Sequence, residues 1–467
     1  MQVIGTLVAA LVAIFTILPG ALETLPNLTR WWQERFPPIP PARAGETLIV
    51  IAPYQSPAGI DRSAIHKEIM RTLRAEHEAL RREVNAPTLN LRIAEAPQAL
   101  NVDDQSAAEA LGRRVGATLV IWGEVSDVRV TTNILNLRQP EEVIINLSET
   151  ERTPLANPQA FTRYVTSDLP GIAVYISFSI LGDAYYSAKE YPTATRLLER
   201  AVARLPEDAP LADVAQTFFR LGWLYQVSDN NPAQAIAAYD RALELDPKNA
   251  IACYNRGLAR RAQGDLTQAI ADYTCAIELN SEYVSAYLSR GSARRAQGDL
   301  AGALADYKHA LKLDPRSANA YIGRGLTYYD QGNLTQAIYD YTAAISFDPK
   351  NVIAYNNRGL ARRAQGDVAG AIVDYNRAIE LDPEYAHAYN NRGYARYKQG
   401  DLAGAIADYD RAIELDPNYV NAYMNRGAAR RDQGDRQGAL ADFEHARALT
   451  RDPQDQKWLD EQIANLK

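Results

Sequence analysis

The chain has 467 residues, of which 47% are hydrophobic, and a formal net charge of −7. This hydrophobic content is enough to form a packed core. The negative charge argues against a nucleic-acid binder driven by bulk charge, because phosphate binding needs a basic face. The only two cysteines, Cys253 and Cys275, do not make the framework of a disulfide-rich fold. We interpret them as packing and surface substitutions.

The amino terminus carries a long uncharged apolar stretch, residues 3–22. About 20 helical residues span about 30 Å, the hydrocarbon thickness of a bilayer. We therefore predict a transmembrane anchor over residues 1–22. A cleaved signal peptide is the alternative, but no Lys or Arg precedes the apolar stretch.

Three arginines, Arg30, Arg35 and Arg43, follow the predicted span. The positive-inside rule then predicts a single-pass membrane protein whose soluble part lies in the cytoplasm, although short-tailed signal anchors often have the opposite orientation. Residues 23–44 form a linker that includes the sequence FPPIPP at residues 36–41. Because proline fixes φ, we expect a stiff, extended spacer.

Residues 45–151 have a different periodicity, which predicts a small α/β domain followed by a linker over residues 152–174. Helices are expected after Asp61 and after Asp104, where an aspartate can cap the first turn. Short apolar or alternating segments predict five strands, at residues 48–54, 89–94, 118–125, 128–135 and 142–147. The order βαβαβββ is typical of two helices packed over one sheet.

The segment from Ala108 to Val125 reads A-x-x-L-G-x-x-x-G-A-x-x-V-I-W-G-E-V. With the strand ending in Ala52-Pro53-Tyr54, it resembles the amino-terminal α/β domain of Tol-system β-propeller proteins, whose relatives also accompany repeats in bacterial signalling proteins. The resemblance implies a partner-binding or sensory module without chemistry. Pro53 also prevents a phosphate-binding loop after the first strand.

An R-G pair recurs every 34 residues in the second half of the chain. Its glycines are Gly257, Gly291, Gly325, Gly359, Gly393 and Gly427. Self-similarity at this period indicates a helix–turn–helix solenoid. The block at residues 352–385 has small, aromatic and turn residues at characteristic places: Gly359, Gly366, Asp367, Ala371, Tyr375, Ala378 and Pro383. It resembles the tetratricopeptide repeat (TPR).

Two degenerate repeats precede the six regular ones, around Gly182 and Gly222. We therefore predict a mainly α fold, with a TPR α-solenoid of about eight repeats over residues 175–453. The apolar positions of residues 454–467 predict a carboxy-terminal helix that covers the last repeat. The transmembrane helix and the small α/β domain would precede this solenoid.

The regular repeats share a charged pair, when each is numbered from 1 to 34 with the R-G glycine at position eight. Position seven is always Arg and position twenty-three always Asp, whereas the degenerate repeats have Leu181 with Leu197 and Leu221 with Ala238. We infer structural ion pairs across the two helices of each repeat; an arginine that grips a ligand is the alternative. The pairs include Arg358 with Asp374 and Arg392 with Asp408.

The TPR resemblance implies that the first helix of each repeat lines a concave groove. Position six then supplies Asn255, Asn357, Asn391 and Asn425, and position five adds Asn356 and Asn390, but Ser289 and Gly323 interrupt the row. A carboxamide donates and accepts hydrogen bonds and can satisfy an extended peptide backbone. Asparagine as a tolerated polar residue on a solvated helix is the alternative.

Position twelve supplies four arginines, next to further arginines at position eleven. The four arginines at position twelve are Arg261, Arg295, Arg363 and Arg431. If they face inward, the groove is basic and favours an acidic, extended partner. Arginine stems also pack along helices with their heads in water, which is the alternative.

These features predict a membrane-anchored scaffold that binds a protein or peptide segment in the concave groove. The alternative is a small-molecule sensor in the α/β domain, with the repeats as a transmitter or an oligomerisation element. We expect no enzyme, no catalytic residue, no metal site and no cofactor, because the sequence has no nucleophile–base pattern, metal-ligand spacing or phosphate loop. Nucleic acid is not an expected partner.

Overall fold

The computed structural model separates into two compact units, Met1–Asn231 and Pro232–Lys467, and each is described by itself. The structure describes residues 47–51, 63–84, 91–95, 119–125, 130–136, 144–148, 169–205 and 214–466, together with the single residues 108, 111 and 113. The predicted anchor (residues 1–22), the linker that follows it (residues 23–44) and most of the helix expected after Asp104 lie outside the described residues.

The first unit contains a five-stranded sheet with the order β2-β1-β3-β4-β5. Its strands are β1 (Thr47–Ile51), β2 (Leu91–Glu95), β3 (Leu119–Val125), β4 (Val130–Asn136) and β5 (Ile144–Ser148). Strand β1, the second in this order, pairs in parallel with both of its neighbours, and the remaining pairs are antiparallel. The consecutive apolar residues Ile49, Val50 and Ile51 of β1 are fully buried, as expected of a strand covered on both faces.

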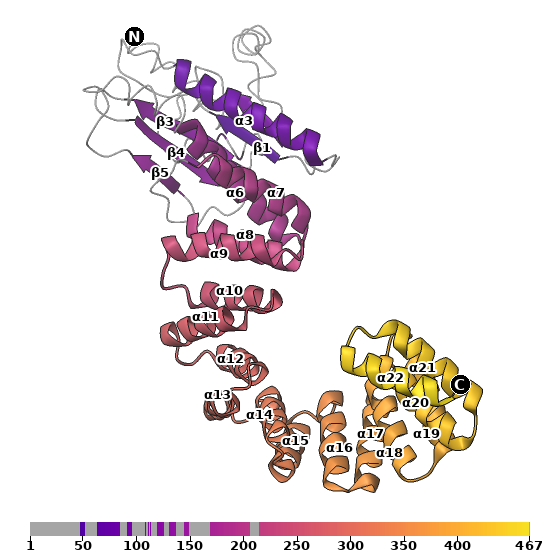
Figure 1. The fold of residues 1–467 in the computed structure, drawn as a ribbon. Coiled ribbons are helices and arrows are strands. Elements are labelled where there is room, and N and C mark those ends of the chain that lie inside the picture. The colour runs from indigo at the N-terminus through magenta and orange to yellow at the C-terminus, as the bar shows by residue number, and fades with distance from the viewer. Residues whose placement is uncertain are drawn as a thin grey trace, which may run out of the picture. The chain divides into compact units, whose positions relative to one another are not determined.

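The helices of this unit that the structure describes from end to end are drawn in Figure 1. They are α3 (Ser63–Val84), α6 (Leu169–Ser187), α7 (Tyr191–Ala203) and α8 (Val214–Val227). Helix α3 is amphipathic and buries Ile69, Met70 and Leu73. Helix α6 has no polar face along most of its length, so it needs protein on all sides. It is covered in part by α3 and α7, both of which it contacts.

The prediction of a separate α/β domain with two helices over the sheet is therefore corrected. Helix α3 packs against α6 and α7 as well as against β2. The carboxylate of Glu76 on α3, only 5% exposed, accepts hydrogen bonds from Arg200 (2.9 Å) and Arg204 (2.7 Å) on α7. Helix α3 thus connects the sheet to the first solenoid helices, which a change of sequence periodicity cannot reveal.

The transmembrane prediction is also corrected. Within the part of the chain that the structure describes, no helix combines the length and the apolar character needed to cross a membrane. The apolar stretch at residues 3–22 is outside that part. The absence of a membrane-spanning helix among the described residues contradicts the predicted single-pass architecture, and with it the cytoplasmic orientation. We do not retain either prediction.

The second unit is a stack of antiparallel helix pairs (Figure 1). Its helices are α9 (Pro232–Leu245), α10 (Ala250–Ala262), α11 (Leu266–Leu279), α12 (Val284–Ala296), α13 (Leu300–Leu313), α14 (Ala318–Asp330), α15 (Leu334–Phe347), α16 (Val352–Gln365), α17 (Val368–Leu381), α18 (Ala386–Lys398), α19 (Leu402–Leu415), α20 (Val420–Gln433), α21 (Arg436–Leu449) and α22 (Pro453–Leu466). The last helix, α22, buries Leu459 against Phe443 of α21.

Local sequence explains each pair, as the repeat at residues 352–385 illustrates. Asn351 and Asp367 cap the amino ends of α16 and α17 by accepting from backbone N–H groups three residues later. Gly359 lets the two helices approach closely, because a Cβ there would lie 2.6 Å from the ring of Tyr375. Tyr375 is itself fully buried, so its ring forms the centre of the repeat.

A disulfide joins Cys253 on α10 to Cys275 on α11, with the two Cα atoms 6.1 Å apart. Our interpretation of these cysteines as independent packing and surface substitutions is therefore wrong. The spacing of 22 residues places both cysteines in one helix pair, where they face each other.

Candidate partner-binding site

The first helices of the repeats lie on the inner side of the second unit. Neighbouring first helices contact one another, α12 with α14, α14 with α16, α16 with α18 and α18 with α20, whereas neighbouring second helices make fewer contacts. A stack in which one row of helices is closer together curves towards that row. The face predicted to bind a partner is therefore the inner one.

The six Arg–Asp pairs inferred from the repeats are present, and the aspartates are at most 4% exposed. The Nη2···Oδ1 distances are 2.6 Å for Arg256–Asp272, 2.7 Å for Arg290–Asp306, 2.7 Å for Arg324–Asp340, 2.7 Å for Arg358–Asp374, 2.6 Å for Arg392–Asp408 and 2.6 Å for Arg426–Asp442. Burial raises the pKa of Asp272, and the hydrogen bond to Asp340 raises the pKa of Arg324.

The arginine at position seven also joins neighbouring repeats. Arg358 donates to Thr342 of the preceding repeat (3.2 Å), and Arg392 donates to Asn376 (2.7 Å). With its guanidinium engaged by two helices, this arginine has a structural role. The arrangement does not favour the alternative of a ligand-gripping arginine.

The arginines at position eleven do not line the groove. Arg362 donates to Asp374 at 2.8 Å, and Arg260, Arg294, Arg396 and Arg430 contact the equivalent aspartates. Position eleven follows position seven by one helical turn, so both arginines lie on the same helix face. The repeat at residues 318–351 differs, because Tyr328 replaces this second arginine.

The asparagines of the last three repeats form hydrogen-bonded pairs between first helices. Asn391 donates to Asn356 (2.9 Å), and Asn425 donates to Asn390 (3.0 Å). Asn356 and Asn390 are 4% and 6% exposed, so these buried side chains fix the orientation of Asn391 and Asn425 through the two hydrogen bonds. Asn357, Asn391 and Asn425 are partly exposed on the inner face. Asn255 is also partly exposed there, but it lies apart from these three.

The gap in the asparagine row at Gly323 has a steric cause. A Cβ at Gly323 would lie 2.4 Å from the ring of Tyr307 on the preceding helix α13. The aromatic ring therefore occupies the space that an asparagine side chain takes in the later repeats. The polar row cannot continue through this point of the groove.

We expect the substitution Gly323→Asn to lower the free energy of unfolding by about 1–3 kcal/mol, because a buried ring must move. Chemical denaturation checks this. The matched control is Ser289→Asn, at the same position of the preceding repeat, where a side chain already fits. Equal stabilities of the two variants would contradict the steric explanation.

The four position-twelve arginines have different surroundings. Arg261 is exposed. Arg295 forms an ion pair with Asp330 of the next repeat at 2.8 Å, and Arg431 contacts Asp432 (2.9 Å) and Gln462 (2.8 Å). Arg363 instead lies over the ring of Tyr394, 4.5 Å from its centroid. The inner face is therefore less basic than its arginine count predicts.

Sequence reasoning missed the residues at position thirteen that neutralise some of these arginines. Asp330 accepts from Arg295, and Asp432 accepts from the hydroxyl of Tyr397. Both contacts join residues 35 apart, as do Asn356–Asn391 and Asn390–Asn425. A search for complementary residues at this spacing would have found them.

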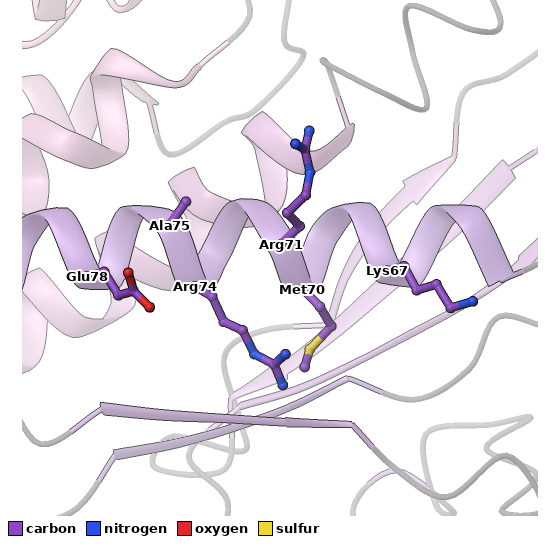
Figure 2. Close-up of a pocket in the computed structure, with 6 residues that line it drawn as sticks. All are labelled: Lys67, Met70, Arg71, Arg74, Ala75 and Glu78. Carbon is purple, nitrogen blue, oxygen red and sulfur yellow. The ribbon is translucent and has the colours of Figure 1, made fainter.

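Helix α3 of the first unit carries a shallow pocket of about 390 Å³ (Figure 2). It is lined by Lys67, Met70, Arg71, Arg74, Ala75 and Glu78. Figure 2 shows the charged side chains extending from one helix, and Arg71 is already paired with Glu68 (3.0 Å). The charged side chains that line the pocket are exposed, which gives little support to the alternative of a small-molecule sensor.

Comparison with known families identifies the repeats. Residues 291–434 match, in four overlapping segments, a family model described as TPR repeat, and residues 221–284 match one described as tetratricopeptide repeat. Because the matches begin at residue 221, they give no support to the resemblance of residues 45–151 to the Tol-system domain. Among curated proteins, no sequence matches the chain.

Several solved structures are similar to the repeats. A tetratricopeptide repeat protein from Parabacteroides merdae ATCC 43184 has 22% identity and a TM-score of 0.47, and the match covers 55% of this chain and 99% of that one. MamA has 31% identity and a TM-score of 0.32, with 36% and 91% covered. YrrB, described as a TPR protein with an unusual peptide-binding site, has 25% identity and a TM-score of 0.33, with 40% and 97% covered.

Proposed function

The chain carries tetratricopeptide repeats, and we propose that it is a scaffold that binds an extended segment of a partner protein along the inner face of α16, α18 and α20. TPR proteins generally mediate protein–protein interactions. The observation that carries the proposal is the row of Asn357, Asn391 and Asn425, two of which are held in place by buried asparagines. A fixed carboxamide can donate to and accept from a peptide backbone whatever its side chains are.

Rigid presentation supports this function. Each asparagine lies on a helix that is tied to its own partner helix and to the preceding repeat by the position-seven arginine. A partner segment would meet a groove that is already ordered, so binding would cost less conformational entropy than on a mobile surface. The scaffold contributes geometry and no chemical step.

Site-specific photocrosslinking in the full-length chain tests this proposal. We expect a photoreactive residue at Asn357 or Asn391 to capture a partner protein from a lysate of the source cells. The matched control is Val373, on the second helix α17, which is 63% exposed and faces away from the groove. Crosslinks at Val373 of equal yield, or none at the two asparagines, would contradict the proposal.

A further inference from the structure

Arg363 has a different electrostatic environment from the other arginines of its row. The residue 35 positions after Arg295 is Asp330, which pairs with it, whereas the residue 35 positions after Arg363 is Lys398. Both cations lie over one ring, with Arg363 4.5 Å and Lys398 5.3 Å from the centroid of Tyr394. Among the described ion pairs, neither cation has a carboxylate partner.

Two buried hydroxyl groups belong to the same region. The Oη atoms of Tyr375 and Tyr409 have no hydrogen-bond partner, although both side chains are fully buried. Gly359, one helical turn before Arg363, lies against the ring of Tyr375. Tyr397, next to Lys398, packs against Tyr409. Burial raises the pKa of both tyrosines, and the positive charge of Arg363 opposes this rise in both. The phenols therefore remain protonated and can donate.

A buried donor without a partner costs free energy, and native proteins rarely retain one without a reason. Here two such donors accompany two cations that take part in none of the described ion pairs. The carboxylate of Asp432 interacts electrostatically with Lys398, but it already accepts hydrogen bonds from Tyr397 and Arg431. The group that would satisfy this set is an anion with two acceptor oxygens.

We infer that Arg363, Lys398 and the hydroxyls of Tyr375 and Tyr409 bind an aspartate or glutamate side chain of the partner segment. This inference rests on the proposed function and specifies one subsite of the same groove. Arg363 follows Asn357 by six residues, about 9 Å along the helix axis. An extended segment bound by the asparagine row can therefore place an acidic side chain on Arg363.

Binding of a labelled hexaglutamate peptide to the full-length chain, measured by fluorescence anisotropy, tests this subsite. Hexaglutamine of the same length is the uncharged control. We expect Arg363→Gln to weaken hexaglutamate binding by about tenfold or more, since hydrogen bonds to a charged group contribute this much. The matched control Arg295→Gln removes the same charge at the same position of another repeat, where the arginine already forms an ion pair with Asp330. We expect this control to change hexaglutamate binding by less than about twofold.

The variants Tyr375→Phe and Tyr409→Phe separate binding from folding. Each removes one unpaired hydroxyl from a ring that stays in place, so we expect unchanged or increased thermal stability together with binding weakened about threefold to tenfold. A purely structural role of these tyrosines would leave binding unchanged. Arg363→Lys, which keeps the charge, should retain part of the affinity.

Three results would overturn the inference. They are equal losses for Arg363→Gln and Arg295→Gln, no preference for hexaglutamate over hexaglutamine, and displacement of the peptide by inorganic phosphate as effectively as by free glutamate. The last result would assign the site to a free anion. Photocrosslinking at Asn357 does not depend on Arg363, so its success would leave the groove proposal standing while the subsite fails.

Discussion

Replacing Arg324 with leucine is expected to destabilise the helix pair α14–α15 by about 3–5 kcal/mol, because it leaves a buried charge without its partner. Asp340 is completely buried, and its two carboxylate oxygens accept from Nε (2.8 Å) and Nη2 (2.7 Å) of Arg324. In the other regular repeats a second arginine at position eleven also contacts the aspartate, but here that residue is Tyr328. The Asp340 carboxylate therefore depends on one guanidinium.

Arg358→Leu is the matched control, because Asp374 keeps its contact with Arg362 at 2.8 Å. We expect Arg358→Leu to lower the free energy of unfolding by a smaller amount, about 1–3 kcal/mol. Urea denaturation measures the global stability of the two variants. Because a solenoid can open locally, hydrogen exchange of the backbone amides of α14–α15 and α16–α17 measures the local stability of each helix pair. Equal losses of stability in Arg324→Leu and Arg358→Leu would contradict the view that Arg362 compensates for the loss of Arg358.

The double variant Arg324→Leu/Asp340→Leu should recover most of the stability. A buried ion pair can often be replaced by apolar residues at little cost, even though removal of one partner is expensive. The first degenerate repeat has this arrangement, because Leu181 and Leu197 occupy the same two positions and are both buried. A double variant as unstable as Arg324→Leu would exclude a simple charge-burial effect.

Contacts within one repeat could be predicted from the sequence because repetition serves as an internal alignment. Arg358 and Asp374 are 16 residues apart in one helix hairpin, and their joint replacement in the degenerate repeats indicates contact. Helix-face geometry could also have placed Arg362 on Asp374. Arg362 follows Arg358 by one helical turn and so lies on the same helix face, although it neighbours Arg363 in the sequence.

Contacts between dissimilar elements could not be predicted in this way. Glu76 and Arg200 are 124 residues apart, and no repeat relates the helices that carry them. The hydrophobicity of α6 indicates burial but does not identify α3 as the element that covers it. The row of asparagines was identified from the sequence, whereas the burial of Asn356 and Asn390 depends on the spacing of neighbouring first helices.

Reduction of the Cys253–Cys275 disulfide is expected to lower the stability of the α10–α11 pair by about 3 kcal/mol, since the crosslink closes a loop of about 22 residues in the unfolded chain. The Cα separation of 6.1 Å lies in the range that disulfides adopt. Denaturation with and without a phosphine reductant measures the difference. Titration of free thiols in the native and the unfolded protein establishes the starting redox state.

Sister repeats provide a matched variant without the crosslink. At the two equivalent positions, Tyr287 stacks on His309 and Tyr423 packs on His445, with ring centroids 4.3 Å apart in both pairs. The variant Cys253→Tyr/Cys275→His should therefore restore packing between α10 and α11, and its stability should not respond to reductant. An equal response of variant and wild type, or no response of the wild type, would contradict a stabilising disulfide. Because the two cysteines stand where two sister repeats have a packed aromatic pair, the crosslink stabilises a contact that those repeats make without a covalent bond.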